Sequence, residues 1–303
     1  MKRLYVIGNG FDLHHNLPTG LNDFRDYIKL NHPLEYQNIH HFFYRYYGHI
    51  ERDDWNELET LLSCTIQINA MLDDAIEYSE RDMDRAPFWN DIQYSVMGIE
   101  RDLKLLKESI DSWIASIDIS AHKPKNYIHF ESDAIFLTFN YTTTLQQLYN
   151  VLDTQVLHIH GSNTQEKVLG HNEQYYELQL SNITQEDVEN GMEEDWRIEE
   201  AKEVLNRIPI LFYKNSESII KSNRAFFNNV SSCNEIVFMG WSLGLQDKIY
   251  MDAILSTIKK DSMINVVYYN DNDKQRYQSF FVKYNCNKYS VSYYTWETIG
   301  ELF

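Results

Sequence analysis

Short, mostly apolar runs that indicate strands occur at the start of the chain and again from residue 134 onward. They cover residues 4–7, 134–139, 156–159, 235–239, 264–269 and 289–295. Apolar runs of this length are typical of strands buried on both faces of a parallel sheet. Segments with helical spacing lie between them, near residues 142–151, 197–207, 216–231, 246–258 and 273–284. The alternation predicts an α/β fold with a Rossmann-like, doubly wound parallel sheet.

Residues 21 to about 120 have helical spacing instead. Apolar residues separated alternately by four and three positions predict one face of a long helix, formed by Ile92, Val96, Ile99, Leu103, Leu106, Ile110, Trp113 and Ile117. A less regular stripe contains Trp55, Leu58, Leu62, Ile66 and Leu72 or Ile76. We predict a helical-bundle insertion over 25–125, packed on a core of residues 1–24 and 126–303. The long apolar face is expected to be intramolecular core rather than a coiled coil between two chains.

The charge of the chain changes which ligands are expected. It carries 27 basic and 45 acidic residues, for a net charge of −18. General nucleic-acid binders neutralise phosphates with clustered lysine and arginine, so this class is excluded. Main-chain N–H groups can still bind the phosphates of a single dinucleotide.

The cysteines and the N-terminus indicate the compartment. Cys64, Cys233 and Cys286 lie far apart with no Cys-x-x-Cys pair, which favours reduced structural thiols over a disulfide framework or a zinc ribbon. The first apolar run stops at Gly8, too early for a signal peptide. No stretch approaches the roughly 20 apolar residues of a membrane helix. We expect a soluble, cytoplasmic protein that does not bind membranes.

Gly8, Asn9 and Gly10 directly follow the first predicted strand. Glycines here permit a sharp turn and let the main chain approach a pyrophosphate. The full fingerprint G-x-G-x-x-G is absent because position 13 is leucine, so a tight turn without a ligand explains the glycines equally well. Asn9 tolerates positive φ and can bond to nearby main chain.

Asn140 and two histidines follow the next two predicted strands. Asn140 is either a ligand-binding residue at the end of its strand or the cap of the following helix. Alternation along the third strand is expected to place His158 and His160 on the same face, with Gly161 and Ser162 behind them. A metal site built from these histidines with Asp12, His14 or His171 has no recognisable ligand spacing, and we expect no metal.

Two later strands are also followed by polar loops. Gly240 and Ser242 follow the fourth strand, with Asp247 a little further on, and Asn270 follows the fifth. Serine, asparagine and aspartate can bond to ribose hydroxyls, and glycine allows close approach of main chain. Because the carboxyl ends of parallel strands meet at one edge of a sheet, a single crevice is expected to collect all these loops.

Taken together, these segments resemble the AbiH proteins, a family named for abortive infection by bacteriophage. The matching segments are Ile7-Gly8-Asn9-Gly10-Phe11-Asp12-Leu13, Leu17-Pro18-Thr19-Gly20, Phe139-Asn140-Tyr141-Thr142, His158-Ile159-His160-Gly161-Ser162, Gly170-His171-Asn172 and Phe238-Met239-Gly240-Trp241-Ser242-Leu243. The helical stretch 25–125 and the acidic, loop-like stretch 173–200 carry no such motif. The resemblance implies an anti-phage abortive-infection effector.

AbiH proteins are in turn similar to the sirtuin-like fold of defence NAD hydrolases. That similarity implies catalytic roles for Asn140 and His160. It implies nucleotide-binding roles for Gly8, Asn9, Gly10, Phe11, Asp12, Gly161, Ser162, His171, Gly240, Ser242 and Asn270. Thr142 stands where the sirtuin-like pattern has an aspartate, so a carboxylate that assists ribose chemistry is missing there. The zinc-binding cysteine pairs of the deacetylases are missing too, which argues against deacetylation.

The resemblance implies hydrolysis of NAD to nicotinamide and ADP-ribose. Asn140 is then expected to position a water or the ribose hydroxyls, and His160 to act as general base. The alternative from another class is a non-catalytic nucleotide sensor whose helical insertion signals to a partner. A metal-dependent phosphodiesterase that uses the histidines is a third. The expected partners are NAD or a related nucleotide, and either a second copy of the chain or another defence protein.

Overall fold

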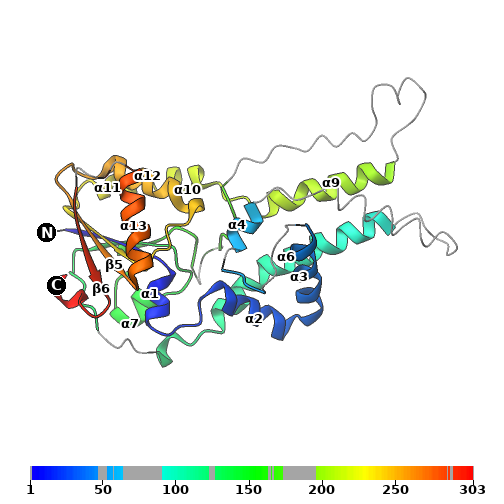
Figure 1. The fold of residues 1–303 in the computed structure, drawn as a ribbon, viewed down its shortest axis with the longest axis horizontal. Coiled ribbons are helices and arrows are strands. Elements are labelled where there is room, and N and C mark those ends of the chain that lie inside the picture. The colour runs from blue at the N-terminus through cyan, green and yellow to red at the C-terminus, as the bar shows by residue number, and fades with distance from the viewer. Residues whose placement is uncertain are drawn as a thin grey trace, which may run out of the picture. The chain divides into compact units, whose positions relative to one another are not determined.

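The computed structural model describes residues 2–46, 53–56, 58–63, 91–122, 127–162, 165, 167–172, 196–284, 286 and 289–302. The chain forms two compact units (Figure 1). The first contains Met1–Asp23, Asp111–Val168 and Asn215–Phe303, and the second contains Phe24–Ile110 and Leu169–Lys214. The domain boundaries expected from the sequence stay a prediction.

The first unit contains a parallel sheet, six-stranded over the described residues. The strands are β1 (Arg3–Ile7), β2 (Ile135–Thr138), β3 (Val156–His158), β4 (Glu235–Met239), β5 (Met263–Tyr268) and β6 (Ser290–Thr295). Their order is β3-β2-β1-β4-β5-β6, and every neighbouring pair is parallel. The predicted Rossmann-like α/β fold is confirmed, and each predicted strand agrees to within one residue at either end.

Helices cover both faces of this sheet. They are α1 (Asn9–His14), α7 (Thr144–Tyr149), α10 (Ser216–Ser222), α11 (Arg224–Val230), α12 (Lys248–Thr257) and α13 (Asp271–Lys283), with 3-10 helices η2 (Ile119–Ala121), η3 (Asp153–Gln155), η4 (Leu245–Asp247) and η6 (Ile299–Leu302). Side chains of α11, α12 and α13 pack on the face that contains Leu4 and Val6. Phe11 of α1 and Leu145 of α7 pack on the opposite face, with Tyr5. Alternate β1 residues therefore enter two separate cores, as a strand buried on both faces requires.

One predicted helix is divided in two. The spacing predicts a single helix over 216–231, whereas α10 ends before Asn223 and α11 begins after it. The side-chain amide of Asn223 donates to the carbonyl oxygen of Ile219 at 2.8 Å. Asparagine commonly competes for main-chain partners in this way, which periodicity does not reveal.

The helices of the second unit lie mainly between β1 and β2 in the chain. They are α2 (Leu21–Asn31), α3 (Pro33–Tyr46), α4 (Leu58–Ser63), α6 (Asp91–Ala115) and, later in the sequence, α9 (Trp196–Leu211). α2 and α6 run past the unit boundaries at one end. The predicted long helix is α6, although Ile117 lies beyond its end. Its residues Val96, Leu103, Leu106, Ile110 and Trp113 are buried within the single chain, as expected for intramolecular core.

Some predicted features lie outside the described residues. These are Ile66, Leu72 and Ile76 of the second stripe, and residues 173–195 of the acidic stretch. Trp55, Leu58 and Leu62 of the same stripe are described and buried. None of the helices described here is both long enough and apolar enough to cross a membrane.

Candidate functional site

Four loops meet at the carboxyl end of the sheet. Ile7 of β1 pairs with Thr138 of β2 and with Met239 of β4, and Thr138 pairs with His158 of β3. These strands therefore end at the same level, and the loops that follow them are neighbours. The chain proceeds from β1 to β2 and β3 on one side and returns later to β4 on the other. β1 and β4 thus flank the switch in strand order where open α/β sheets bind ligands.

At Gly8 and Gly10 the main chain of the loop after β1 packs directly against the main chain of the loop after β4. The N–H groups of Gly8 and Gly10 donate to the carbonyl oxygens of Met239 at 3.0 Å and Gly240 at 2.8 Å. A Cβ on Gly8 would lie 2.4 Å from the Cα of Trp241. Gly240 has φ +64°, and a Cβ there would lie 2.4 Å from the N of Phe11. Close approach of the loops after β1 and β4 therefore explains these glycines. Their expected contact with a pyrophosphate stays a prediction.

Asn9 holds the segment that follows α1. Its amide Nδ2 donates to the main-chain oxygen of Thr19 at 2.9 Å, and its Oδ1 accepts from the Thr19 hydroxyl at 2.7 Å. Asn9 lies inside α1, so the positive φ considered for it does not occur. Phe11 is fully buried against rings that include His15, which makes it a core residue of the unit.

Asp12 provides a buried carboxylate in the same loop. Its side chain has no exposed surface, and its Oδ2 accepts from the Thr142 hydroxyl at 2.5 Å. The Thr144 hydroxyl donates in turn to Thr142 at 3.0 Å. Burial raises the pKa of Asp12 to about 6, and the side chains of Thr142, Thr144 and Asn140 partly oppose that rise. Thr142 stands where the sirtuin-like pattern has an aspartate. The carboxylate of Asp12, from α1, is bonded to this threonine.

Asn140 is buried and held through its main chain. Its N–H donates to the Thr138 hydroxyl at 3.1 Å, and its carbonyl accepts from His158 Nδ1 at 3.0 Å. The N-cap residue of α7 is Thr143, so the helix-cap interpretation of Asn140 is wrong. Only 6% of Asn140 is exposed, and its Oδ1 has no hydrogen-bond partner among the described residues. A buried acceptor of this kind requires an explanation, and a bound ligand would supply one.

His158 and His160 have different surroundings. His158 donates from Nδ1 to Asn140, while its Nε2 lies 3.0 Å from Nε2 of Gln146. Burial lowers the pKa of His158, which favours the neutral ring that these two bonds require. β3 ends at His158, so the alternation expected to place both histidines on one face does not reach His160. That expectation is wrong.

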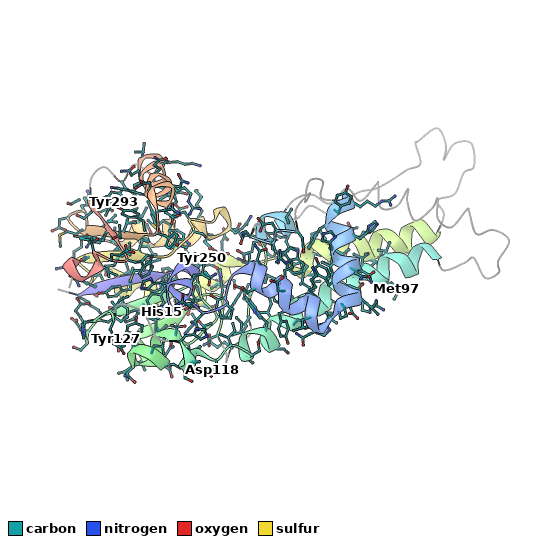
Figure 2. All side chains as sticks on the ribbon, turned by 60° about the horizontal axis from the view of Figure 1, so that its bottom comes forward. His15, Met97, Asp118, Tyr127, Tyr250 and Tyr293 are labelled. Atoms are coloured by element: carbon teal, nitrogen blue, oxygen red, sulfur yellow. The ribbon has the colours of Figure 1, made fainter. Side chains whose placement is uncertain are left out.

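His160 lies beside Asp247, which the sequence offered only as one of several polar residues able to bond to ribose hydroxyls. Its Nε2 lies 3.3 Å from Oδ1 of Asp247. The ring is buried against Phe139 and Tyr250, with centroids 5.4 and 5.8 Å away (Tyr250 is labelled in Figure 2). Asp247 is at the N-cap position of α12, yet its side chain does not cap the helix. The two atoms do not meet hydrogen-bond geometry, so the contact is an ion pair when the ring is protonated. A histidine beside a buried carboxylate is a common arrangement of a general base.

The loop after β4 brings Asp247 to this position. Trp241 stacks on Phe139, with centroids 5.5 Å apart and planes 4° apart, and so joins the loops after β2 and β4. The buried hydroxyl of Tyr277 donates to the Trp241 carbonyl at 2.7 Å. Leu243 has φ +60°, which costs a residue other than glycine free energy. Backbone strain of this kind often occurs in loops at functional sites.

A family model described as "Bacteriophage abortive infection AbiH" matches residues 4–269. The chain belongs to the AbiH family. The match also covers residues 25–125 and 173–200, where the motif resemblance found nothing. Membership indicates a role in abortive infection by bacteriophage. No curated protein and no solved structure matches the chain.

The remaining predicted site residues of this AbiH chain differ in burial, in hydrogen bonding and in the compact unit to which they belong. Ser242 is exposed, whereas Ser162 is buried beside Gly161, which has φ +83°. Asn270 caps α13, because its side chain accepts from the N–H of Asp273 at 3.0 Å. His171 belongs to the second unit, where its N–H donates to Phe212 at 2.9 Å. Nucleotide binding by these residues stays a prediction.

Within the described ranges, no three histidine, cysteine, aspartate or glutamate side chains are grouped so that they could hold a metal ion. From the sequence, Asn140, His160 and Asp12 were named as site residues, whereas Asp247 was noted only as part of a polar loop. The only sequence signal for it was an aspartate following a glycine-containing loop at the end of a strand.

Proposed function

We propose that this AbiH protein binds NAD at the carboxyl end of its sheet and hydrolyses it to nicotinamide and ADP-ribose during abortive infection. The observation that carries the proposal is the buried Asn140 side chain, with an unpartnered Oδ1, in the loop next to the paired His160 and Asp247. A hydrolytic site needs a polar group to hold the substrate and a base to activate water. Asn140 and His160 offer these two groups where the strand order of the sheet switches. As part of the proposal the protein acts in the cytoplasm, in keeping with the buried free thiols of Cys233 and Cys286.

The reaction places modest demands on the protein. When the bond between C1′ and the nicotinamide nitrogen breaks, its electron pair neutralises the positive pyridinium, so the leaving group needs no acid. An oxocarbenium-like ribose remains, and the oxygen of a water forms the new bond to C1′. In this proposal Asn140 positions the water or a ribose hydroxyl. His160 accepts the water proton on its second ring nitrogen while Asp247 holds Nε2 and stabilises the cationic ring.

Binding is the first test of the proposal. NAD or ADP-ribose at millimolar concentration is expected to raise the melting temperature, because a ligand that binds only the folded state stabilises it. The gain is about 2.7 kcal/mol when the ligand is present at 100 times its Kd. Differential scanning fluorimetry measures the shift, with Asn140→Ala as the matched protein that should respond less. If neither ligand moves the melting temperature of the wild type, the nucleotide proposal fails.

Chelation tests the phosphodiesterase alternative. We expect nicotinamide release to be unaffected by EDTA, since every step of the proposed mechanism uses side chains and water. Elemental analysis of the purified protein should find no stoichiometric zinc or manganese. Activity that is lost to EDTA and restored by a divalent cation would rank the metal-dependent alternative first.

A further inference from the structure

We infer that Lys167 is a phosphate-binding residue of the nucleotide site, with its ammonium group placed by Asp111. The inference names the side chain that binds the negatively charged part of the substrate, and so deepens the proposed function. It rests on the nucleotide binding in that proposal but not on hydrolysis, so a binding measurement tests it separately from the reaction.

Lys167 differs in charge from the rest of the sheet edge. The segments that follow the first four strands are residues 8–20, 139–143, 159–195 and 240–247. Lys167 is the only lysine or arginine in them, whereas Asp12 and Asp247 are among their acids. A pyrophosphate is negatively charged, and acids close to it oppose its binding. A dinucleotide site at this edge therefore needs a nearby cation, and Lys167 is the side chain available.

Main-chain hydrogen bonds place Lys167 close to the proposed catalytic residues. The N–H of the next residue, Val168, donates to the carbonyl oxygen of His160 at 2.9 Å. The carbonyl oxygen of Val168 accepts from the Tyr141 hydroxyl at 2.9 Å, and Tyr141 directly follows Asn140. In NAD the pyrophosphate is attached to the ribose at which Asn140 and His160 are proposed to act. A flexible lysine side chain on this segment is therefore well placed to reach it.

Lys167 is buried although its acidic partner is not. Only 6% of its side chain is exposed, against 68% of the side chain of Asp111, with which it forms an ion pair. Burial of an ammonium group costs desolvation free energy, and an exposed carboxylate that stays hydrated offsets little of that cost. A phosphate bound at the ammonium group would supply the counter-charge that Asp111 supplies only weakly.

The ammonium group also has unused hydrogen-bonding capacity. A lysine side chain has three N–H donors. Within the described part of the chain, Nζ of Lys167 makes one hydrogen bond, to Oδ1 of Asp111. Buried donors are normally paired, and phosphate oxygens accept strong hydrogen bonds from lysine. A phosphate satisfies both the remaining donors and the charge, whereas a neutral acceptor would satisfy only the donors.

The direct test replaces Lys167 by methionine, which fills the space of the buried stem without the charge. Isothermal titration calorimetry should find the Kd for ADP-ribose raised about 10- to 100-fold, the usual loss for a hydrogen bond to a charged group. The affinity for inorganic pyrophosphate should fall as well, and added salt should narrow the difference from the wild type. With NAD as substrate, KM should rise while kcat changes far less, because the phosphates do not react.

Two further variants separate phosphate binding from a purely structural ion pair. Lys248→Met removes the same charge next to Asp247, but this lysine is half exposed and pairs with Asp252 at 3.3 Å, so the Kd should change less than about twofold. Asp111→Asn keeps an acceptor for Lys167 and removes a negative charge near the phosphate. It should therefore bind ADP-ribose about two- to fivefold more tightly. If the ion pair only fastens the loop to α6, Asp111→Asn will weaken binding as Lys167→Met does, and that result would overturn the inference.

The inference and the hydrolase proposal can fail independently. A wild type that binds ADP-ribose through Lys167 but releases no nicotinamide would reject the hydrolase and keep the inference. A wild type that hydrolyses NAD, with the KM and the Kd for ADP-ribose unchanged in Lys167→Met, would keep the hydrolase and overturn the inference. If circular dichroism shows that Lys167→Met does not fold, the direction of the Asp111→Asn effect decides. A wild type that binds neither ADP-ribose nor pyrophosphate at millimolar concentration would overturn both.

Discussion

Replacing His160 or Asn140 by alanine is expected to lower the rate of nicotinamide release by about 10²–10⁴-fold, the usual loss when a positioned general base is removed. His160 is the only side chain in the proposed mechanism that accepts a proton, and Asp247 keeps its ring in place at 3.3 Å. In the same mechanism Asn140 positions the water or a ribose hydroxyl. Chromatography of the products of purified wild type and variants incubated with NAD measures the effect.

Each of these variants has a control close by. His158→Ala removes a ring that bonds to the main-chain carbonyl of Asn140 and to the side chain of Gln146 but has no part in the proposed mechanism. The rate of nicotinamide release should therefore fall by less than about tenfold. Thermal melting of Asn140→Ala should remain near that of the wild type, because the side chain caps no helix. A His158 variant as inactive as the His160 variant would remove the reason for assigning the base to His160.

Gly240→Ala is expected to cause the largest loss of stability. The φ of +64° is unfavourable for any residue with a Cβ, and the new atom would lie 2.4 Å from the N of Phe11. The obstructing atoms belong to main chain, so no side chain can move aside. The combined cost of the conformation and the overlap is about 2–5 kcal/mol in the free energy of unfolding.

Gly98→Ala is the matched control for that variant. A Cβ on Gly98 meets nothing within 4 Å, and the residue lies inside α6, where alanine is favoured over glycine by about 0.5–1 kcal/mol. Urea denaturation should therefore move the two midpoints in opposite directions. A Gly240→Ala protein with the wild-type midpoint would show that the loops after β1 and β4 do not pack as described.

The strands were predictable because the signal for them is local. A strand buried on both faces is mostly apolar, and β4 (Glu235–Met239), which is apolar after its first residue, follows a predicted run without a shift at either end. The loop residues at the strand ends were predictable for a related reason, since parallel strands must present their carboxyl ends together. Asn140 and His160 could be named as candidates before any contact was known.

The partners of these residues were not predictable from sequence spacing. Asp12 and Thr142 are separated by 130 positions in the chain, and nothing local to either indicates the other. Asp247 was noted only as part of the polar loop after the fourth strand, and only the fold brings it to His160. The prediction that His158 and His160 lie on the same face was wrong because it extended the alternation of a strand beyond His158, where β3 ends.

The measurement that tests the central claim most directly is the NAD content of phage-infected cells that the wild-type protein protects. Liquid chromatography with mass spectrometry should find NAD falling and ADP-ribose and nicotinamide accumulating after infection. In cells with Asn140→Ala or His160→Ala, present at the same protein level, NAD should stay constant and protection should be lost. Full protection by both variants with unchanged NAD would contradict the hydrolase account and leave nucleotide sensing as the function of the site.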